Sequence, residues 1–144
     1  MNTGGPGYTD PSANVWSADT GYNGGSVYAV QNVIANTTTQ PLYQTERYGS
    51  GTLQYQFAVA NGSYTVNLKF AEIYFNTAGQ RVFNILINGQ PVQSNFDIVA
   101  AAGGSFRAID LSYPVSVTGG QITIQLTPLV NNPKISAIEI LGGP

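Results

Sequence analysis

Hydrophobic and polar residues alternate with a period of two along several short stretches of the chain. The clearest stretches have hydrophobic residues at positions 53, 55, 57 and 59, at 64, 66, 68 and 70, at 83, 85 and 87, and at 122, 124 and 126. A period of two puts these side chains on one face of an extended chain, so each stretch predicts a half-buried antiparallel strand. No stretch of useful length has a helical period, and Ser26 to Ile34 is the best candidate for one short helical turn.

Glycine-containing turns separate the predicted strands. They are Asn61-Gly62, Asn88-Gly89 and Gly119-Gly120. Asn-Gly favours the type I′ hairpin turn, because that turn needs positive φ at both central positions. We therefore predict a hairpin at each of the three. Evenly spaced strands with such turns predict an all-β fold, a jelly-roll β-sandwich of two antiparallel sheets.

The segment from Gly4 to Gly25 differs from the rest of the chain. It is rich in glycine, aromatic and small polar residues and shows little alternation, which predicts a long loop. Tyr8, Trp16 and Tyr22 argue against disorder in this loop, because aromatic rings normally find a surface on which to pack.

The composition excludes several classes of partner. A chain of 144 residues is long enough for one domain with a substantial core. Only 8% of the residues are charged, about a third of the usual share, and the net charge is −2. Without a basic face, neither nucleic acid nor an anionic membrane is expected as a partner. The remaining polar groups are mostly amides, hydroxyls and tyrosines, which suit an uncharged, hydroxyl-rich ligand.

Missing residue types narrow the chemistry further. The chain has no cysteine and no histidine, which excludes disulfides, thiolate and histidine-dependent catalysis, and the usual zinc sites. No apolar run approaches the roughly 20 residues of a membrane span. The opening residues lack the basic and apolar regions of a signal peptide. Either the protein is cytosolic, or residues 1–144 are one module taken from a longer protein. We favour the second interpretation, with Leu141 to Pro144 as the start of a linker.

Aromatic residues gather where predicted strands end. Tyr48 follows one strand-like run, Tyr74 and Phe75 follow the strongest strand, and Asn131 lies in the turn before the last strand. Flat rings can cover the C–H face of a sugar ring while amides or carboxylates bridge its hydroxyls. The plainer interpretation is that the rings close the end of the core, and the pattern alone favours that interpretation.

Two acidic residues offer a second function. Glu46 and Glu72 could serve as the acid and nucleophile of a small glycosidase. Alternatively, they pair with Arg47, Arg81 or Lys69 and fix the loops beneath the tyrosines. We favour ion pairing, because both glutamates lie within strand-like runs.

The sequence also does not exclude a binding site for a structural metal ion. Asp97 and Asp110 are interpreted as turn or structural carboxylates. They or backbone carbonyls could bind a structural calcium ion, although no ligand spacing of the EF-hand type supports this. No other cofactor is expected.

Six motifs, in order, resemble the malectin domain family. They are LYQTERY at 42–48, KFAEIYF at 69–75, RVFNI at 81–85, ING at 87–89, FDI at 96–98 and NNPKI at 131–135. The glycine-rich opening Gly4 to Tyr8 also resembles this family. The resemblance covers nearly the whole chain. The length and the absence of cysteine are similar to those of a bacterial member, of the kind appended to secreted glycosidases as a carbohydrate-binding module.

The resemblance implies a non-catalytic jelly roll whose loop end binds a gluco-disaccharide. It places the family's aromatic contacts on Tyr48, Tyr74 and Phe75, and a further tyrosine on Tyr28. The carboxylate of the family's last binding loop falls on Asn131. An amide there offers one acceptor and one donor group in place of a charged acceptor, so a different linkage or weaker binding is expected.

The sequence is therefore consistent with three functions. The first is a module outside the cell that tethers a catalytic or surface domain to a neutral glycan of the glucan type. The second is a structural spacer or adhesin domain without sugar binding, and the third is a small glycosidase. Retention of Tyr48, Tyr74 and Phe75 favours the first.

Overall fold

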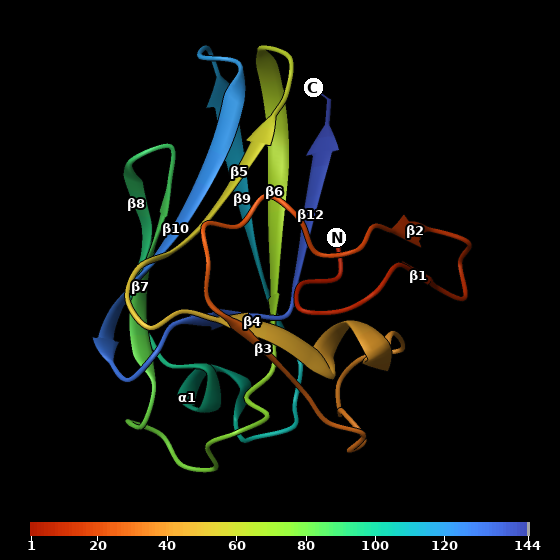
Figure 1. The fold of residues 1–144 in the computed structure, drawn as a ribbon, viewed down its shortest axis with the longest axis vertical. Helices are drawn as coiled ribbons and strands as arrows, with labels where there is room; N and C mark the ends of the chain where they lie inside the picture. The colour runs from red at the N-terminus through yellow and green to blue at the C-terminus, as the bar shows by residue number, and fades with distance from the viewer. Residues whose placement is uncertain (144) are drawn as a thin grey trace.

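β-Strands dominate the computed structural model, which describes residues 1–143 (Figure 1). The strands are β1 (Tyr8–Thr9), β2 (Val15–Trp16), β3 (Ser26–Ala29), β4 (Thr45–Tyr48), β5 (Leu53–Ala58), β6 (Gly62–Phe70), β7 (Val82–Ile87), β8 (Gln90–Phe96), β9 (Ile109–Val117), β10 (Gln121–Val130), β11 (Lys134–Ile135) and β12 (Ala137–Gly142). A 3₁₀ turn, η1 (Gln40–Tyr43), and one short helix, α1 (Ile98–Ala102), complete the described elements.

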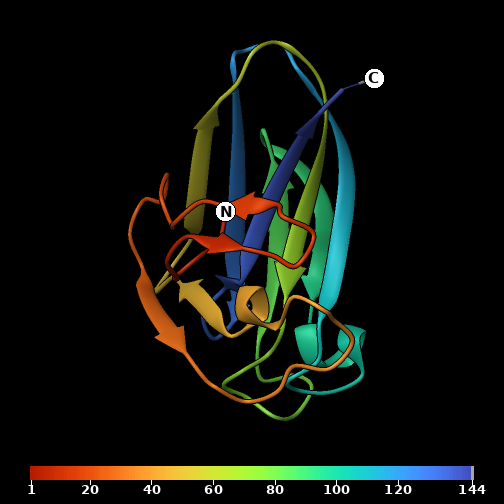
Figure 2. The same ribbon diagram turned by 90° about the vertical axis from the view of Figure 1, so that its right-hand side faces the viewer.

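Two long antiparallel sheets form the body of the molecule. One has the strand order β5-β10-β7-β8 and the other β12-β6-β9. The turned view shows their long strands running along the length of the molecule (Figure 2). Alternate residues of both sheets meet in one buried core, as the period of two predicted. Its members include Leu53, Tyr55, Val66, Leu68, Phe70, Phe83, Ile85, Phe96, Ile122, Ile124, Leu126 and Ile138. The predicted all-β sandwich is confirmed.

Two smaller sheets add to the predicted pair. The order β11-β4-β3 forms a three-stranded sheet, and β1 pairs with β2 in a hairpin that projects from one side (Figure 1). These strands have two to four residues, too few for a period of two to be visible in the sequence. The three-stranded sheet crosses the end of the sandwich and carries part of the site described below.

Only one of the three predicted hairpins forms. Asn88 and Gly89, with φ of 49° and 79°, join the paired strands β7 and β8. The predictions for the other two turns were wrong, because Asn61-Gly62 leads from β5 to β6 and Gly119-Gly120 from β9 to β10, and both cross between the sheets. A turn motif specifies a local reversal but not which strand lies alongside. The two crossing turns bind each other instead, since the Gly120 amide donates to Asn61 Oδ1 at 2.9 Å.

The helical prediction for Ser26 to Ile34 was also wrong. Ser26–Ala29 is strand β3, paired antiparallel to β4. The helix that does form, α1, is capped by Asp97, whose side chain accepts from the Ala100 amide, and ends at Gly103 with φ of 84°. Asp97 also accepts from the Gly79 amide at 2.6 Å. Its role as a structural carboxylate follows from these bonds.

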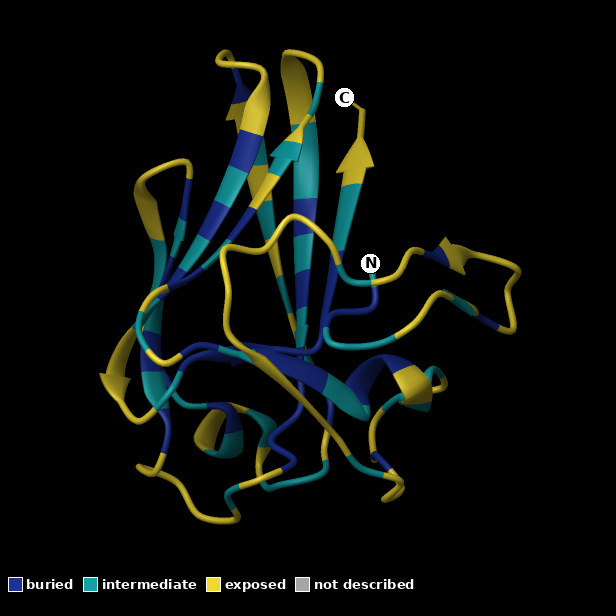
Figure 3. Ribbon diagram, viewed as in Figure 1, coloured by how far each residue is buried: buried dark blue, intermediate teal, exposed yellow. Residues whose placement is uncertain are grey.

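Side-chain bonds order the segment from Gly4 to Gly25. Trp16 is buried, and its indole N–H donates to Asp10 at 3.1 Å, a bond that lowers the pKa of that carboxyl. Further along, Asp19 accepts from the Tyr55 hydroxyl at 2.7 Å and pairs with Arg47 at 2.7 Å. Burial, followed by the Asp19 bond, raises the pKa of Tyr55. The segment is therefore packed, as its aromatic residues predicted, although it is largely exposed on its outer side (Figure 3).

None of the helices in residues 1–143 combines the length and the hydrophobicity that a membrane span requires.

Candidate functional site

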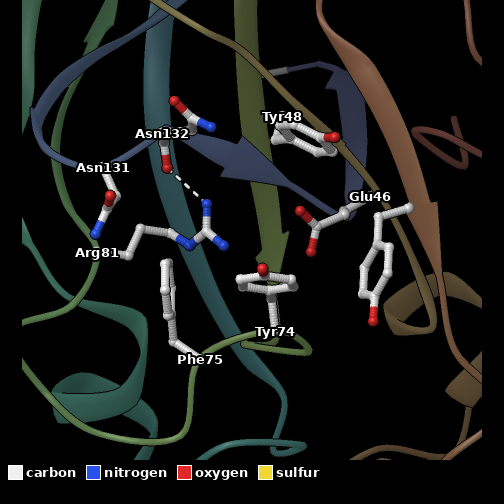
Figure 4. A pocket seen from close by; sticks show the side chains of 8 residues that line it. Glu46, Tyr48, Tyr74, Phe75, Arg81, Asn131 and Asn132 are labelled. Atoms are coloured by element: carbon white, nitrogen blue, oxygen red, sulfur yellow. Dashed lines mark hydrogen bonds between the residues drawn. The ribbon is translucent and has the colours of Figure 1, made fainter.

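A pocket of about 420 Å³ opens where the small sheet meets the loops at one end of the sandwich (Figure 4). Its lining comes from four parts of the chain that are distant in sequence. The lining residues are Tyr28, Glu46, Tyr48, Tyr74, Phe75, Arg81, Asn131 and Asn132. The volume lies within the range of about 300–1,000 Å³ that is usual for small-molecule pockets.

Strands β3 and β4 supply one wall. Glu46 and Tyr48 are two residues apart on β4 and therefore share a face, while Arg47 points to the other side. Tyr28 on β3 lies directly opposite Glu46 in the antiparallel register. The pairing of β3 with β4 thus brings two tyrosines and a carboxylate to one surface.

Two glycines allow other segments of the same chain to pack closely against β4. A Cβ on Gly4 would lie 2.1 Å from the backbone oxygen of Glu46, and a Cβ on Gly25 would lie 2.4 Å from that of Tyr48. Both glycines have positive φ, at 72° and 84°. Only glycine fits either position without moving the strand that carries the pocket residues.

The loop after β6 supplies the facing rings. Tyr74 is 66% exposed and lies edge-to-face with Tyr28, with ring centroids 5.7 Å apart, and with Phe75 at 5.0 Å. The buried Glu72 holds this loop, because its Oε2 accepts from the backbone amides of both Tyr74 and Phe75, at 3.2 and 3.3 Å. One carboxylate therefore fixes the backbone of both aromatic residues.

Arg81 links this loop to the opposite wall. Its Nε lies 2.7 Å from Glu72 Oε1, and its Nη2 donates to Glu72 Oε2. Its Nη1 donates to the Asn132 carbonyl at 2.6 Å (Figure 4). The guanidinium also stacks 4.9 Å from the Phe75 ring centroid. The buried pair of Arg81 and Glu72 thus connects the aromatic loop with the loop between β10 and β11.

Asn131 lies in the loop between β10 and β11, at the rim of the pocket. Its φ is 55°, a left-handed conformation that asparagine tolerates better than most residues. The side-chain amide donates to the Gln80 carbonyl at 2.6 Å. This is the one side-chain hydrogen bond that Asn131 makes within residues 1–143, so its Oδ1 and second amide hydrogen could reach a ligand.

Glu46 forms the most buried polar part of the lining. Its side chain is 2% exposed, and its Oε1 lies 3.1 Å from Nζ of Lys134, which is completely buried. Lys134 also donates to the Ala71 carbonyl. The lining therefore includes one member of each of two buried ion pairs, Glu46 with Lys134 and Arg81 with Glu72.

All five site residues predicted from the sequence line this one pocket. Sequence reasoning did not assign Arg81 or Asn132 to the lining, and it considered Glu46 only as a catalytic or loop-fixing group. The alternation of Glu46 and Tyr48 on one strand was the available signal for Glu46. Arg81 and Asn132 had no such signal, because only the tertiary fold brings their loops together.

The acidic residues are placed for structure more than for catalysis. Glu72 pairs with Arg81, as one of the predicted alternatives had it, but Glu46 pairs with Lys134, which was not among the predicted partners. Glu72 lies beyond the end of β6, not within a strand as predicted. Asp110 accepts from Tyr43 and pairs with Lys69. In residues 1–143, no group of three or more acidic side chains is placed to hold a metal ion.

Comparison with known protein families gives a direct match. The sequence model of the malectin domain matches residues 1–138. The chain belongs to the malectin family. Malectin domains are a carbohydrate-binding fold, and the malectin homologues are binding modules and not enzymes.

Several curated relatives support the assignment to the malectin family. Human malectin is 34% identical over 124 residues, covering 76% of this chain and 42% of that protein, and Malectin-B of Xenopus laevis is similar to the same degree, with 45% of it covered. A probable leucine-rich repeat receptor-like serine/threonine-protein kinase of Arabidopsis thaliana is 36% identical over 84% of this chain but only 14% of its own length. The chain thus spans less than half the length of these relatives.

Solved structures show the same fold. The extracellular domain of ANXUR1 from Arabidopsis thaliana matches 99% of this chain and 47% of its own, with a TM-score of 0.89 and 24% identity. Bacteroides uniformis β-glucuronidase 2 matches the whole chain with a TM-score of 0.88 and 25% identity, over 17% of its own length. In both proteins the malectin fold is part of a longer chain.

Proposed function

We propose that this malectin domain binds a neutral, glucose-containing oligosaccharide in the pocket lined by Tyr28, Tyr48, Tyr74, Phe75 and Asn131. The observation that carries the proposal is the convergence of four aromatic residues with amide and carboxylate groups in one open pocket of a carbohydrate-binding fold. Exposed rings supply faces for the C–H groups of a pyranose, and the polar groups bridge its hydroxyls.

In this proposal the domain acts as a tether, which holds an attached domain at the glycan that the pocket binds. A module of this kind works outside the cell, attached to a catalytic or surface domain. ANXUR1 carries the same fold in its extracellular domain, and the β-glucuronidase carries it as a small part of its chain. The domain itself does no chemistry in this proposal. It raises the local concentration of its attached domain at a glycan.

Tyr74→Ala tests the proposal directly. We expect titration calorimetry with maltose, nigerose and laminaribiose to give micromolar to millimolar affinity for the parent domain with at least one sugar, about −4 to −8 kcal/mol. Tyr74→Ala should weaken that binding by about 1–3 kcal/mol, because the loss of the ring removes stacking area. Raising the salt concentration should hardly matter, because a neutral ligand releases no counterions.

Tyr22→Ala is the matched control. Tyr22 is 44% exposed and lies outside the pocket, where it stacks on Arg47. This variant should bind like the parent once a thermal melt has shown that it is folded. Failure of the parent to bind any of the three sugars would leave the structural spacer as the better function.

Asn131 gives a second prediction. Asn131→Gly should weaken binding by about 1–3 kcal/mol, because it removes the amide but keeps a residue that accepts the positive φ. Asn131→Ala adds backbone strain to the same loss and should also lower the melting temperature. Asn131→Asp restores the carboxylate of the malectin pattern and should shift preference towards the α-linked maltose and nigerose, at the cost of the bond to the Gln80 carbonyl. Unchanged binding of all sugars by Asn131→Gly would make Asn131 only a turn former.

A further inference from the structure

The Glu46 carboxylate is a buried acceptor that the protein leaves largely unused. Its side chain is 2% exposed and points into the space between the rings of Tyr48 and Tyr74 (Figure 4). Oε1 lies 3.1 Å from Nζ of Lys134, within ion-pair distance, but it accepts no hydrogen bond within residues 1–143. A carboxylate has about four acceptor positions, and buried acceptors are normally satisfied.

Arg81 and Lys134, the cationic side chains near the pocket, already bind acidic side chains or backbone carbonyls of the protein. Arg81 directs its Nε, Nη1 and Nη2 to Glu72 and the Asn132 carbonyl, and is 5% exposed. Lys134 is completely buried and donates to the Ala71 carbonyl. No cation in the lining is therefore placed to neutralise an anionic ligand, whereas Glu46 offers a negative acceptor.

We propose that Glu46 contacts the ligand and selects neutral sugars. Its carboxylate accepts a hydrogen bond from a hydroxyl of a pyranose, and the same charge excludes sugars that carry a carboxylate at that position. This inference rests on the proposed sugar-binding function and adds the residue that selects neutral over acidic sugars. Bonds from hydroxyls to a carboxylate are among the strong hydrogen bonds, and like charges repel more strongly where one of them is buried, as Glu46 is.

The first test uses the parent domain alone, so that no variant has to fold. Maltose, nigerose and laminaribiose are each titrated beside the analogue in which C6 of the non-reducing glucose is a carboxylate. We expect the acid to bind at least about tenfold more weakly than the neutral sugar that binds best. Equal or tighter binding of the acid would overturn the selection of neutral sugars.

The second test uses Glu46→Gln, which keeps the shape and removes the charge. We expect this variant to bind the best neutral sugar about 10- to 100-fold more weakly. The ratio of its affinity for the neutral sugar to its affinity for the acid analogue should also be smaller than in the parent. Because the substitution leaves Lys134 without its counterion, Glu46→Gln/Lys134→Gln is measured in parallel, and a thermal melt checks both folds. Parent-like affinity with an unchanged ratio in a folded variant would overturn the contact.

The outcomes separate this inference from the proposed function. If the parent binds none of the three neutral sugars, both are overturned. If it binds a neutral sugar but fails the first test, the pocket remains a sugar site and the selection of neutral sugars is overturned. If it fails the second test, Glu46 is only a partner of Lys134. An adequate proof requires the neutral sugar to bind, its acid to be rejected, and the rejection to weaken when the charge of Glu46 is removed.

Discussion

Arg81→Met should lower the free energy of unfolding by about 3–5 kcal/mol and weaken sugar binding together with it. The substitution keeps most of the aliphatic stem but leaves Glu72 as a buried charge without a partner, which is the costly half of breaking a buried ion pair. It also removes the bond from Arg81 to the Asn132 carbonyl. The two loops that carry Tyr74 and Asn131 would then lose their connection. Urea unfolding gives the stability, and calorimetry gives the affinity.

Arg47→Met is the control for the loss of binding. Arg47 also forms an ion pair, with Asp19, but the two side chains are 9% and 8% exposed and the pair lies on the side of β4 away from the pocket. This variant should lose less stability and keep its affinity for sugar. If both variants bind sugar equally well, the link between the loops has no role in positioning the site.

Lys134→Met should cost a similar amount of stability, about 3–5 kcal/mol, by the same mechanism. Lys134 is completely buried, and its removal leaves Glu46 without a counterion. The double variant Glu46→Gln/Lys134→Met should recover a large part of the loss, because replacing both members of a buried pair removes the uncompensated charge. Unfolding in urea measures all three forms under the same conditions.

Lys69→Met provides the comparison at the surface. Lys69 pairs with Asp110 at 2.8 Å, but the Asp110 side chain is 47% exposed, so this pair should contribute about 1 kcal/mol or less. A Lys134→Met variant no less stable than Lys69→Met would mean that the buried charges are already compensated by solvent.

The strands and the core were largely determined by the sequence. The period of two around Leu68, Phe83 and Ile124 reflects a local constraint, since successive side chains of any strand point to opposite faces. Asn88-Gly89 predicted its hairpin correctly because that turn connects strands that do pair. The aromatic residues of the site were found through motifs that are local in sequence.

Other features depended on partners that the local sequence does not name. Asn61-Gly62 and Gly119-Gly120 have the same turn chemistry, yet they cross between sheets, because strand pairing is decided by the packing of the two sheets as a whole. Strand β3 was missed because it has only four residues and all are exposed. Its extended form depends on the hydrogen bonds it makes to β4.

The sequence by itself thus determined the all-β sandwich and the malectin resemblance, and it predicted five residues that line one pocket, Tyr28, Tyr48, Tyr74, Phe75 and Asn131. The tertiary structure alone decided which charges surround them. Alternation places Glu46 beside Tyr48 on β4, but its pairing with Lys134, like the bond from Arg81 to Asn132, joins segments 50 or more residues apart. Ion pairs need only proximity and leave no periodic pattern, so their partners become visible only when the chain has folded.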